Sequence, residues 1–216
     1  MTPLLIFDCD GVLVDSEILS NRAGVELLNE LGLSITLEDH IHRFVGKSAQ
    51  DVEKVLESLL GCPLPEDYGA QKIQRTADLF DAELQAIPGI RQALEQLSGP
   101  RCVASGSHRS RIDQSLRLTG LSGFFEHIFS IEQVEKGKPA PDLFLLAAEA
   151  LGHAPEQCLV IEDSVSGVQA ACAAGMRVLG FTGGSHCAPD HGQQLLEAGA
   201  QQVFQDMADL PELIGF

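Results

Sequence analysis

Residues 4 to 15, LLIFDCDGVLVD, join an apolar run to three acidic side chains. The run Leu4 to Phe7 has no polar residue, which is typical of a strand buried on both faces of a parallel sheet. Asp8 and Asp10 follow directly with one residue between them, and Gly11 comes next. Two like charges at the end of a buried strand repel each other, so the stretch indicates a site that binds a cation.

The composition is that of a globular protein with a large acidic excess. Hydrophobic residues make up 44% of the 216 residues, and 31 Asp and Glu outnumber 14 Lys and Arg. The net charge of −17 repels nucleic-acid phosphates and anionic membranes, so we expect neither as a main partner. The same field repels a phosphorylated metabolite, so a site for one requires local cations.

Features of the sequence also favour a cytoplasmic location. The apolar stretches fall well short of the ~20 residues that span a membrane, and the N-terminal MTPLLIFDCD predicts a strand rather than a secretory signal. The cysteines are scattered and form no C-x-x-C pair, so we expect buried free thiols in a reducing cytoplasm. They are Cys9, Cys62, Cys102, Cys158, Cys172 and Cys187.

From residue 88 onward, helical and strand-like segments alternate. The pattern predicts helices over 88–97, 108–121, 141–152 and 164–175, and strands over 101–105, 127–132, 157–163, 176–182 and 201–204. Alternation of this kind with apolar strands predicts an α/β fold, in which a parallel sheet is covered by helices on both faces.

Residues 16–84 interrupt that alternation. They predict helices over 16–32, 36–46, 48–61 and 66–84, with no strand-like run between them. A helical insert of this size directly after the first strand predicts a small cap domain over 16–84. The catalytic core is then formed by 1–15 together with 85–216.

Polar clusters follow several of the predicted strands. Ligands of an open α/β sheet bind beyond the carboxyl ends of its strands, so these clusters are expected to converge on one edge. They are Asp8 and Asp10, then Ser105, Gly106 and Ser107, then Glu162, Asp163 and Ser164, with Lys138 in a loop that reaches the same edge.

This set of residues favours magnesium-dependent phosphate chemistry. Asp8 and Asp163 offer carboxylates to Mg²⁺, while the backbone carbonyl of Asp10 is a possible ligand and its carboxyl group stays free. Lys138 neutralises excess negative charge, and Ser105 with nearby backbone N–H groups can hold phosphate oxygens. Asp8 is then a candidate nucleophile and Asp10 a candidate general acid and base.

Each cluster taken alone has a structural interpretation as well. An aspartate after a strand often forms a turn, and Glu162 to Ser164 is also a typical helix start. Ser105 taken singly is typical of a turn, and Lys138 of a surface position. The functional interpretation depends on all of them meeting at one sheet edge.

Four motifs resemble those of the haloacid dehalogenase superfamily. DCDGVLVDSE, VASGS, KGKPAPDLFL and VIEDSVSGVQAACAAG are similar to motifs I to IV in order and spacing, across residues 4 to about 182. The resemblance implies a Rossmann-like core with a helical cap of the first type. It further implies Asp8 as nucleophile, Asp10 as acid and base, Ser105 and Lys138 as phosphate binders, and Asp8, Asp10 and Asp163 as Mg²⁺ ligands. Glu162 would hold the metal through water or orient its ligands.

The superfamily contains members with several activities, and the sequence distinguishes between them. Asp10 argues against the dehalogenases and the carbon–phosphorus-cleaving members, which lack that acid. A sugar phosphomutase of the β-phosphoglucomutase type is the main alternative, but Ser20 stands where those mutases carry a histidine. A phosphatase is therefore favoured, and a non-catalytic binding module is the remaining alternative, although none of the catalytic residues is lost.

Substrate selection is expected from the cap. Arg43, Gly46 and Lys47 lie in RFVGKS, which resembles the cap loop that faces the active site in related proteins, and the two cations suit a carboxylate on a sugar-acid phosphate. They are equally compatible with solvated charges at a helix end. Together with Ser105, Gly106 and Ser107 they form the predicted substrate site for a small phosphorylated metabolite, in a protein expected to be a monomer.

Overall fold

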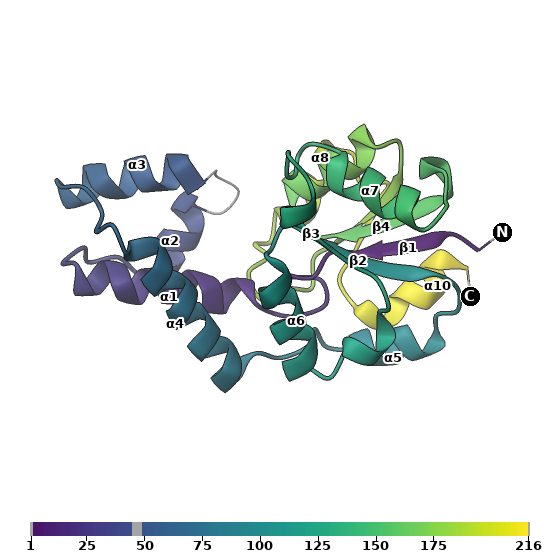
Figure 1. Ribbon diagram of the computed structural model, residues 1–216, viewed down its shortest axis with the longest axis horizontal. Coiled ribbons are helices and arrows are strands. Elements are labelled where there is room, and N and C mark those ends of the chain that lie inside the picture. The colour runs from purple at the N-terminus through teal and green to yellow at the C-terminus, as the bar shows by residue number, and fades with distance from the viewer. Residues whose placement is uncertain (1, 45–48, 216) are drawn as a thin grey trace. The chain divides into compact units, whose positions relative to one another are not determined.

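The structure is a computed structural model that describes residues 2–44 and 49–215, and it divides into two compact units (Figure 1). The first unit comprises Met1–Asp15 and Gln85–Phe216, and the second comprises Ser16–Leu84. The first unit contains the sheet and the second is helical, so the predicted fold class of α/β with a helical insert after the first strand is confirmed.

The sheet of the first unit is entirely parallel within the described residues, with the strand order β3-β2-β1-β4-β5-β6. Its strands are β1 (Leu4–Phe7), β2 (Arg101–Ser105), β3 (Ile128–Ser130), β4 (Cys158–Glu162), β5 (Arg177–Phe181) and β6 (Gln202–Phe204). The chain builds outward from β1 to β3 and then returns to place β4 on the other side of β1. The switch point between β1 and β4 is where such sheets open a crevice for ligands.

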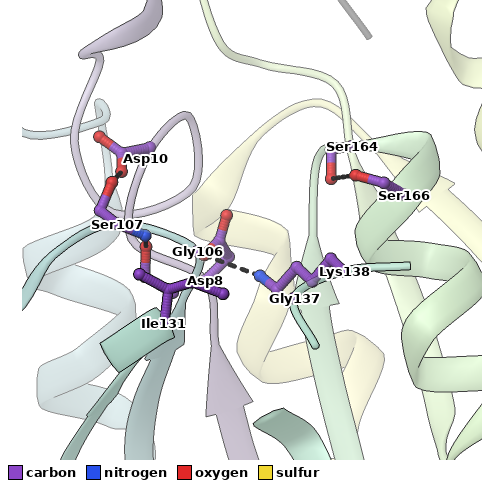
Figure 2. A pocket seen from close by; sticks show the side chains of 10 residues that line it. Asp8, Asp10, Gly106, Ser107, Ile131, Gly137, Lys138, Ser164 and Ser166 are labelled. Carbon is purple, nitrogen blue, oxygen red and sulfur yellow. Dashed lines mark hydrogen bonds and ion pairs between the residues drawn. The ribbon is translucent and has the colours of Figure 1, made fainter. Parts of the chain in front are cut away.

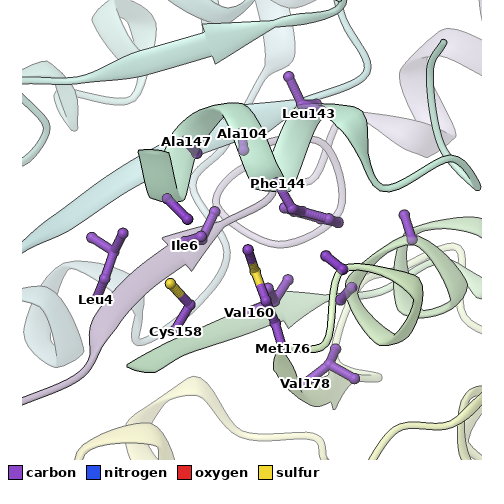
Figure 3. Close-up of a cluster of buried hydrophobic side chains, with 14 of the residues drawn as sticks. Leu4, Ile6, Ala104, Leu143, Phe144, Ala147, Cys158, Val160, Met176 and Val178 are labelled. Atoms are coloured by element: carbon purple, nitrogen blue, oxygen red, sulfur yellow. The ribbon is translucent and has the colours of Figure 1, made fainter. Parts of the chain in front are cut away.

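Helices cover both faces of this sheet (Figure 1). One face carries α7 (Asp142–Ala150), α8 (Val165–Ala173) and α9 (His191–Ala198), and the other carries α5 (Ile90–Gln96), α6 (Arg109–Leu118) and α10 (Leu210–Ile214). Leu4 and Ile6 point to the first face and pack with Phe144 and Val160 in a fully buried cluster (Figure 3). Because neighbouring strand residues point to opposite faces, Leu5 and Phe7 are buried on the other side.

The helical unit is built from α1 (Glu17–Glu30), α2 (Leu37–Phe44), α3 (Ala49–Leu60) and α4 (Tyr68–Glu83). Leu28, Phe44 and Leu56 form its buried centre. One polar contact is buried as well, between His40 Nδ1 and Asn21 Oδ1 at 3.0 Å. This small core positions the four helices that the described residues form.

Several elements differ from the sequence predictions. The predicted strand over 127–132 is wrong at its end, because β3 stops at Ser130 and the 3-10 helix η2 (Ile131–Gln133) follows. Gln133 Oε1 accepts a hydrogen bond from the Ser130 N–H at 2.8 Å, which caps that turn. The helices α9 and α10 were not predicted, since their short sequences carry little apolar periodicity. The other 3-10 helices are η1 (Ser122–Phe124), η3 (Pro155–Gln157) and η4 (Met207–Asp209).

The cysteines are all free, but the expectation that they are buried is only partly correct. Cys9, Cys102 and Cys158 are buried, whereas Cys62 and Cys172 are exposed and Cys187 is half-buried. Cys172 lies on a helix whose apolar residues face the sheet, and its own position falls on the solvent side. Among the described residues, no helix is both long and apolar enough to cross a membrane.

Candidate active site

A pocket of about 290 Å³ opens at the carboxyl ends of the central strands (Figure 2). Most of the predicted core residues line it, and they come from four separate segments of the chain. The lining residues are Asp8, Asp10, Ser105, Gly106, Ser107, Ile131, Gly137, Lys138, Ser164 and Ser166. The prediction that the strand-end clusters converge on one sheet edge is therefore confirmed by the geometry.

Asp8 is the first residue after β1 and is held at the base of this pocket. Its backbone N–H donates to the carbonyl of Ile161 at 3.0 Å, which extends the pairing of β1 with β4 by one residue. Its carboxylate Oδ1 lies 3.0 Å from Lys138 Nζ. Burial raises the pKa of Asp8 well above its ordinary value, Lys138 opposes that rise, and the neighbouring acids add to it.

Lys138 enters the site from the loop between η2 and α7. Its Nζ contacts Glu162 Oε1 at 2.7 Å and donates to the carbonyl of Ala104 at 3.2 Å. It also lies 4.9 Å from the ring centre of Phe144, a favourable place for a cation. Burial alone would lower the pKa of Lys138, but Asp8 and Glu162 raise it above its ordinary value, so the ammonium stays charged.

Glu162 is fully buried and both of its carboxylate oxygens are engaged. Oε1 accepts from Lys138, and Oε2 accepts from the N–H of Ser164 at 2.8 Å and from its hydroxyl at 2.9 Å. The Ser164 hydroxyl in turn accepts from the Gly167 N–H at 3.0 Å and caps α8. Glu162 therefore positions Lys138 and the start of α8.

Asp163 follows Glu162 and contacts a residue that the sequence analysis missed. His186 Nε2 lies 3.0 Å from Asp163 Oδ2, and both side chains are buried. Burial raises the pKa of Asp163, and the hydrogen bond from His186 opposes that rise. Gly11, at φ +76°, allows this approach, because a Cβ there would lie 1.8 Å from Asp163 Oδ2. The glycine of the first motif is thus explained by a close contact with the last.

Asp10 is held by two donors. Its Oδ1 accepts from Arg111 Nη2 at 2.8 Å and its Oδ2 accepts from the Ser107 hydroxyl at 2.5 Å. The loop after β2 and the helix α6 bring these donors to the carboxyl group and fix its orientation. That this group does not ligate the metal stays a prediction. Ser105 accepts a hydrogen bond from the Ser107 N–H at 3.1 Å, which shapes the turn between them.

Arg111 was not among the predicted site residues, and it lies in the first turn of α6. His108 precedes α6, and Arg109 Nε donates to Asp113 at 2.9 Å on the outer side of that helix. Arg111 is two positions after Arg109, which is about half a helical turn, so their side chains point to different sides. Helical periodicity separates Arg111 from Arg109 on α6, but it does not show which side of the helix faces Asp10.

Comparison with known proteins assigns this site to a family. The family described as haloacid dehalogenase-like hydrolase matches residues 5–181. The chain is a haloacid dehalogenase-like hydrolase. It is 33% identical over 212 residues to 6-phosphogluconate phosphatase of Escherichia coli, which covers 97% of this chain and 93% of that protein. It is 34% identical to the phosphorylated carbohydrates phosphatase of Thermotoga maritima, over 91% of each chain.

A solved structure of a conserved haloacid dehalogenase-like protein from Agrobacterium tumefaciens has the same fold as this hydrolase. Its TM-score is 0.90 at 40% identity, and the match covers 99% of this chain and 98% of that chain. The family resemblance inferred from the four motifs is confirmed by these matches.

The acidic residues of the hydrolase form a plausible metal site. Asp8, Glu162 and Asp163 are buried, and one ligand atom from each lies within 4.8 Å of the others. Asp8 Oδ1 has no hydrogen-bond donor besides its ion-pair contact with Lys138. The negative charge of three carboxylates so close together is larger than the positive charge of one lysine. Carboxylate oxygens are the ligands that Mg²⁺ prefers, so these residues fit a magnesium ion.

The remaining predicted residues are not among those that line this pocket, or they lie outside the described residues. Arg43 is an exposed residue of α2 in the helical unit. Gly46 and Lys47 lie outside the described residues, so their substrate role stays a prediction. Asp15, the third acid of the first motif, accepts from the Ser185 N–H at 3.1 Å and from its hydroxyl at 2.8 Å.

Proposed function

We propose that the hydrolase is a magnesium-dependent phosphatase that cleaves a phosphoric monoester of a small sugar or sugar acid. The single observation that carries this is the pairing of Asp8 with Lys138 in a pocket where Asp10 is fixed by Arg111 and Ser107. The reaction class is supported by the family and by relatives that are phosphatases of 6-phosphogluconate and of phosphorylated carbohydrates.

The first step uses both aspartates. A carboxylate oxygen of Asp8 attacks phosphorus, the bond from phosphorus to the sugar oxygen breaks, and an acyl phosphate forms on Asp8. Asp10, in its protonated form, gives its proton to the departing sugar oxygen, which leaves as an alcohol. Arg111 and Ser107 hold the Asp10 carboxyl group in place for this transfer.

The second step regenerates the enzyme. Asp10, now a carboxylate, takes a proton from water, and the resulting nucleophile attacks phosphorus and breaks its bond to Asp8. Inorganic phosphate leaves and Asp10 is again protonated for the next cycle. Proton transfer of this kind typically contributes ~10²–10⁴-fold to a rate.

Positive charge around the phosphoryl group supports both steps. Lys138 offers a buried ammonium, and the Ser105 hydroxyl with the backbone N–H groups of the following turn offers neutral donors. Asp8 and Asp163 would hold Mg²⁺ through their carboxylates and Asp10 through its backbone carbonyl. Bound there, the ion would neutralise negative charge on the transferring group.

Water is favoured over a second sugar hydroxyl as the acceptor. Ser20 on α1 occupies the sequence position where the resemblance to β-phosphoglucomutases calls for a histidine. A serine hydroxyl does not titrate near neutral pH, so it does not replace an imidazole in proton transfer. Hydrolysis of the acyl phosphate needs no such group, since Asp10 activates the water.

The proposal is tested by release of inorganic phosphate from a panel of sugar phosphates, sugar-acid phosphates, polyol phosphates and nucleotides. We expect turnover that EDTA stops and added Mg²⁺ restores. Asp8→Asn should reduce turnover at least ~10³-fold because the nucleophile is lost. The exposed Asp113→Asn is the matched control and should retain activity. Turnover by Asp8→Asn equal to that of the control would overturn the nucleophile assignment.

A further inference from the structure

A second group of metal-ligating side chains lies beside the acidic cluster. His186, Cys187 and His191 each offer one ligand atom, and these atoms lie within 4.8 Å of one another. Cys187 and His191 are half-buried, so an ion can reach them from solvent, whereas the side chain of His186 is 5% exposed. The proposed phosphatase mechanism uses none of them. We propose that these three residues bind a transition-metal ion of the Zn²⁺ type, at a site separate from the one proposed for Mg²⁺.

The distances suit a tetrahedral ion. Zinc binds histidine nitrogen at about 2.0 Å and cysteine sulfur at about 2.3 Å, which places two such ligands about 3.5 Å apart. Cys187 Sγ lies 3.6 Å from His186 Nε2. The two atoms therefore already stand at the separation of ligands that share one ion, with the fourth position open to water.

His191 is oriented for this role by a hydrogen bond on its other nitrogen. Its Nε2 donates to the backbone carbonyl of Asp163 at 2.5 Å. A histidine that binds a metal usually donates its second ring N–H to a carbonyl or carboxylate, which fixes the tautomer and the ring. In His191 this leaves Nδ1 with the lone pair that a metal requires.

His186 is fixed by close packing. A Cβ on Gly184 would lie 2.8 Å from His186 Nδ1, so the ring fits there only because residue 184 has no side chain. Its edge-to-face contact with His191, at 5.9 Å between ring centres, keeps the two imidazoles together. The arrangement is therefore held by the surrounding chain before any ion binds.

The electrostatics of the group favour a cation as well. Asp163 Oδ2 lies 3.0 Å from His186 Nε2, so an ion bound to this nitrogen would replace the proton that the two atoms share, beside a carboxylate that attracts a cation. Nitrogen and thiolate donors suit Zn²⁺ and are poor ligands for Mg²⁺, so the two neighbouring sites select different ions.

Cobalt and zinc binding to the full-length protein test the proposal, with excess Mg²⁺ present throughout to fill the acidic site. Co²⁺ should give a thiolate-to-metal charge-transfer band in the near ultraviolet, and Zn²⁺ should abolish it at one equivalent per chain. Zinc affinity is measured by competition with a chromogenic chelator. Cys187→Ser should remove the band and weaken zinc binding at least ~10-fold, and His191→Gln should weaken it similarly.

The matched controls are Cys62→Ser and Cys172→Ser, which alter the two exposed thiols. Both should keep the band and the zinc affinity of the wild-type protein. The circular dichroism spectrum shows whether each variant is folded. The proposal is overturned if Co²⁺ gives no charge-transfer band, or if Cys187→Ser binds zinc as tightly as Cys62→Ser does.

Discussion

The two units of the molecule use ion pairs in opposite environments. In the sheet unit, Lys138 and Glu162 are paired at 2.7 Å with side chains that are 8% and 0% exposed. In the helical unit, Arg75 and Glu30 are paired at 2.6 Å, yet their side chains are 31% and 59% exposed. The two ion pairs therefore have nearly the same length and differ mainly in how much water reaches their charged groups.

This difference determines what each pair contributes. Water screens an exposed pair, and such pairs typically stabilise a protein by only ~0.2–1 kcal/mol. A buried charge that loses its partner has no water to replace it, and breaking such a pair typically costs ~3–5 kcal/mol. The buried pair in the sheet unit is therefore expected to control function and stability together, and the exposed pair in the helical unit to control neither strongly.

Removal of the buried ammonium should have the largest effect. Lys138→Met leaves Asp8 and Glu162 buried without a cation, so we expect the free energy of unfolding in EDTA to fall by ~3–5 kcal/mol and turnover to be lost. Urea unfolding followed by circular dichroism measures the first, and phosphate release the second. Lys136→Met, an exposed lysine two residues earlier, is the control. Equal stability of the two variants would show that burial does not control the contribution of Lys138.

Loss of the cation next to Asp10 should have a smaller effect, mainly on catalysis. Arg111→Gln removes the donor to Asp10 Oδ1, and we expect kcat to fall ~10–100-fold because the acid is less well positioned. The pH profile of kcat should also shift, since a charge next to the proton-transfer group is gone. Arg109→Gln removes an exposed cation of the same helix and should change neither quantity. If Arg111→Gln lowers only the amount of folded protein and leaves the pH profile of kcat unchanged, Arg111 does not position Asp10.

The buried histidine of the helical unit gives a pH-dependent test. Burial lowers the pKa of His40 to about 4, with a further contribution from Lys72, so the folded protein keeps it neutral. The unfolded chain takes up that proton below about pH 6.5, so the stabilisation is present above that pH and is lost as the pH falls toward 4. Between pH 8 and pH 5 the wild-type protein should lose about 2 kcal/mol more than His40→Gln.

Fluorescence can follow this unfolding because the chain has one tyrosine, Tyr68, and no tryptophan. Tyr68 packs against the core of the helical unit, so its signal reports on that unit. The same loss of stability in wild type and His40→Gln would show that protonation of His40 is not responsible.

The smallest effect is expected at the surface of the helical unit. Arg75→Gln removes the cation that pairs with Glu30, and the free energy of unfolding should fall by less than about 1 kcal/mol. Raising the salt concentration should shrink the difference from wild type, because salt screens exposed charges. A loss as large as that in Lys138→Met would remove the distinction between the two units.

Much of the site could be predicted from the sequence because its residues are adjacent to predictable strands. Asp8, Ser105 and Glu162 lie at or next to strand ends, and parallel strands bring their carboxyl ends to one edge. Arg111 and His186 could not be placed in this way. Arg111 lies within α6 and His186 in a loop after β5, and neither position is tied to a sheet edge by periodicity.

The sequence by itself determined the α/β class, the helical insert and the convergence of the acidic residues, because these follow from local apolar patterns and from the rules of parallel sheets. Only the tertiary structure decided how each charge is compensated. It paired Asp8 with Lys138, Asp10 with Arg111, and Asp163 with His186. Asp10 and Arg111 are 101 positions apart in the sequence. Charge pairing depends on distances of a few ångströms, and these are set by the packing of helices whose relative rotation the sequence pattern does not encode.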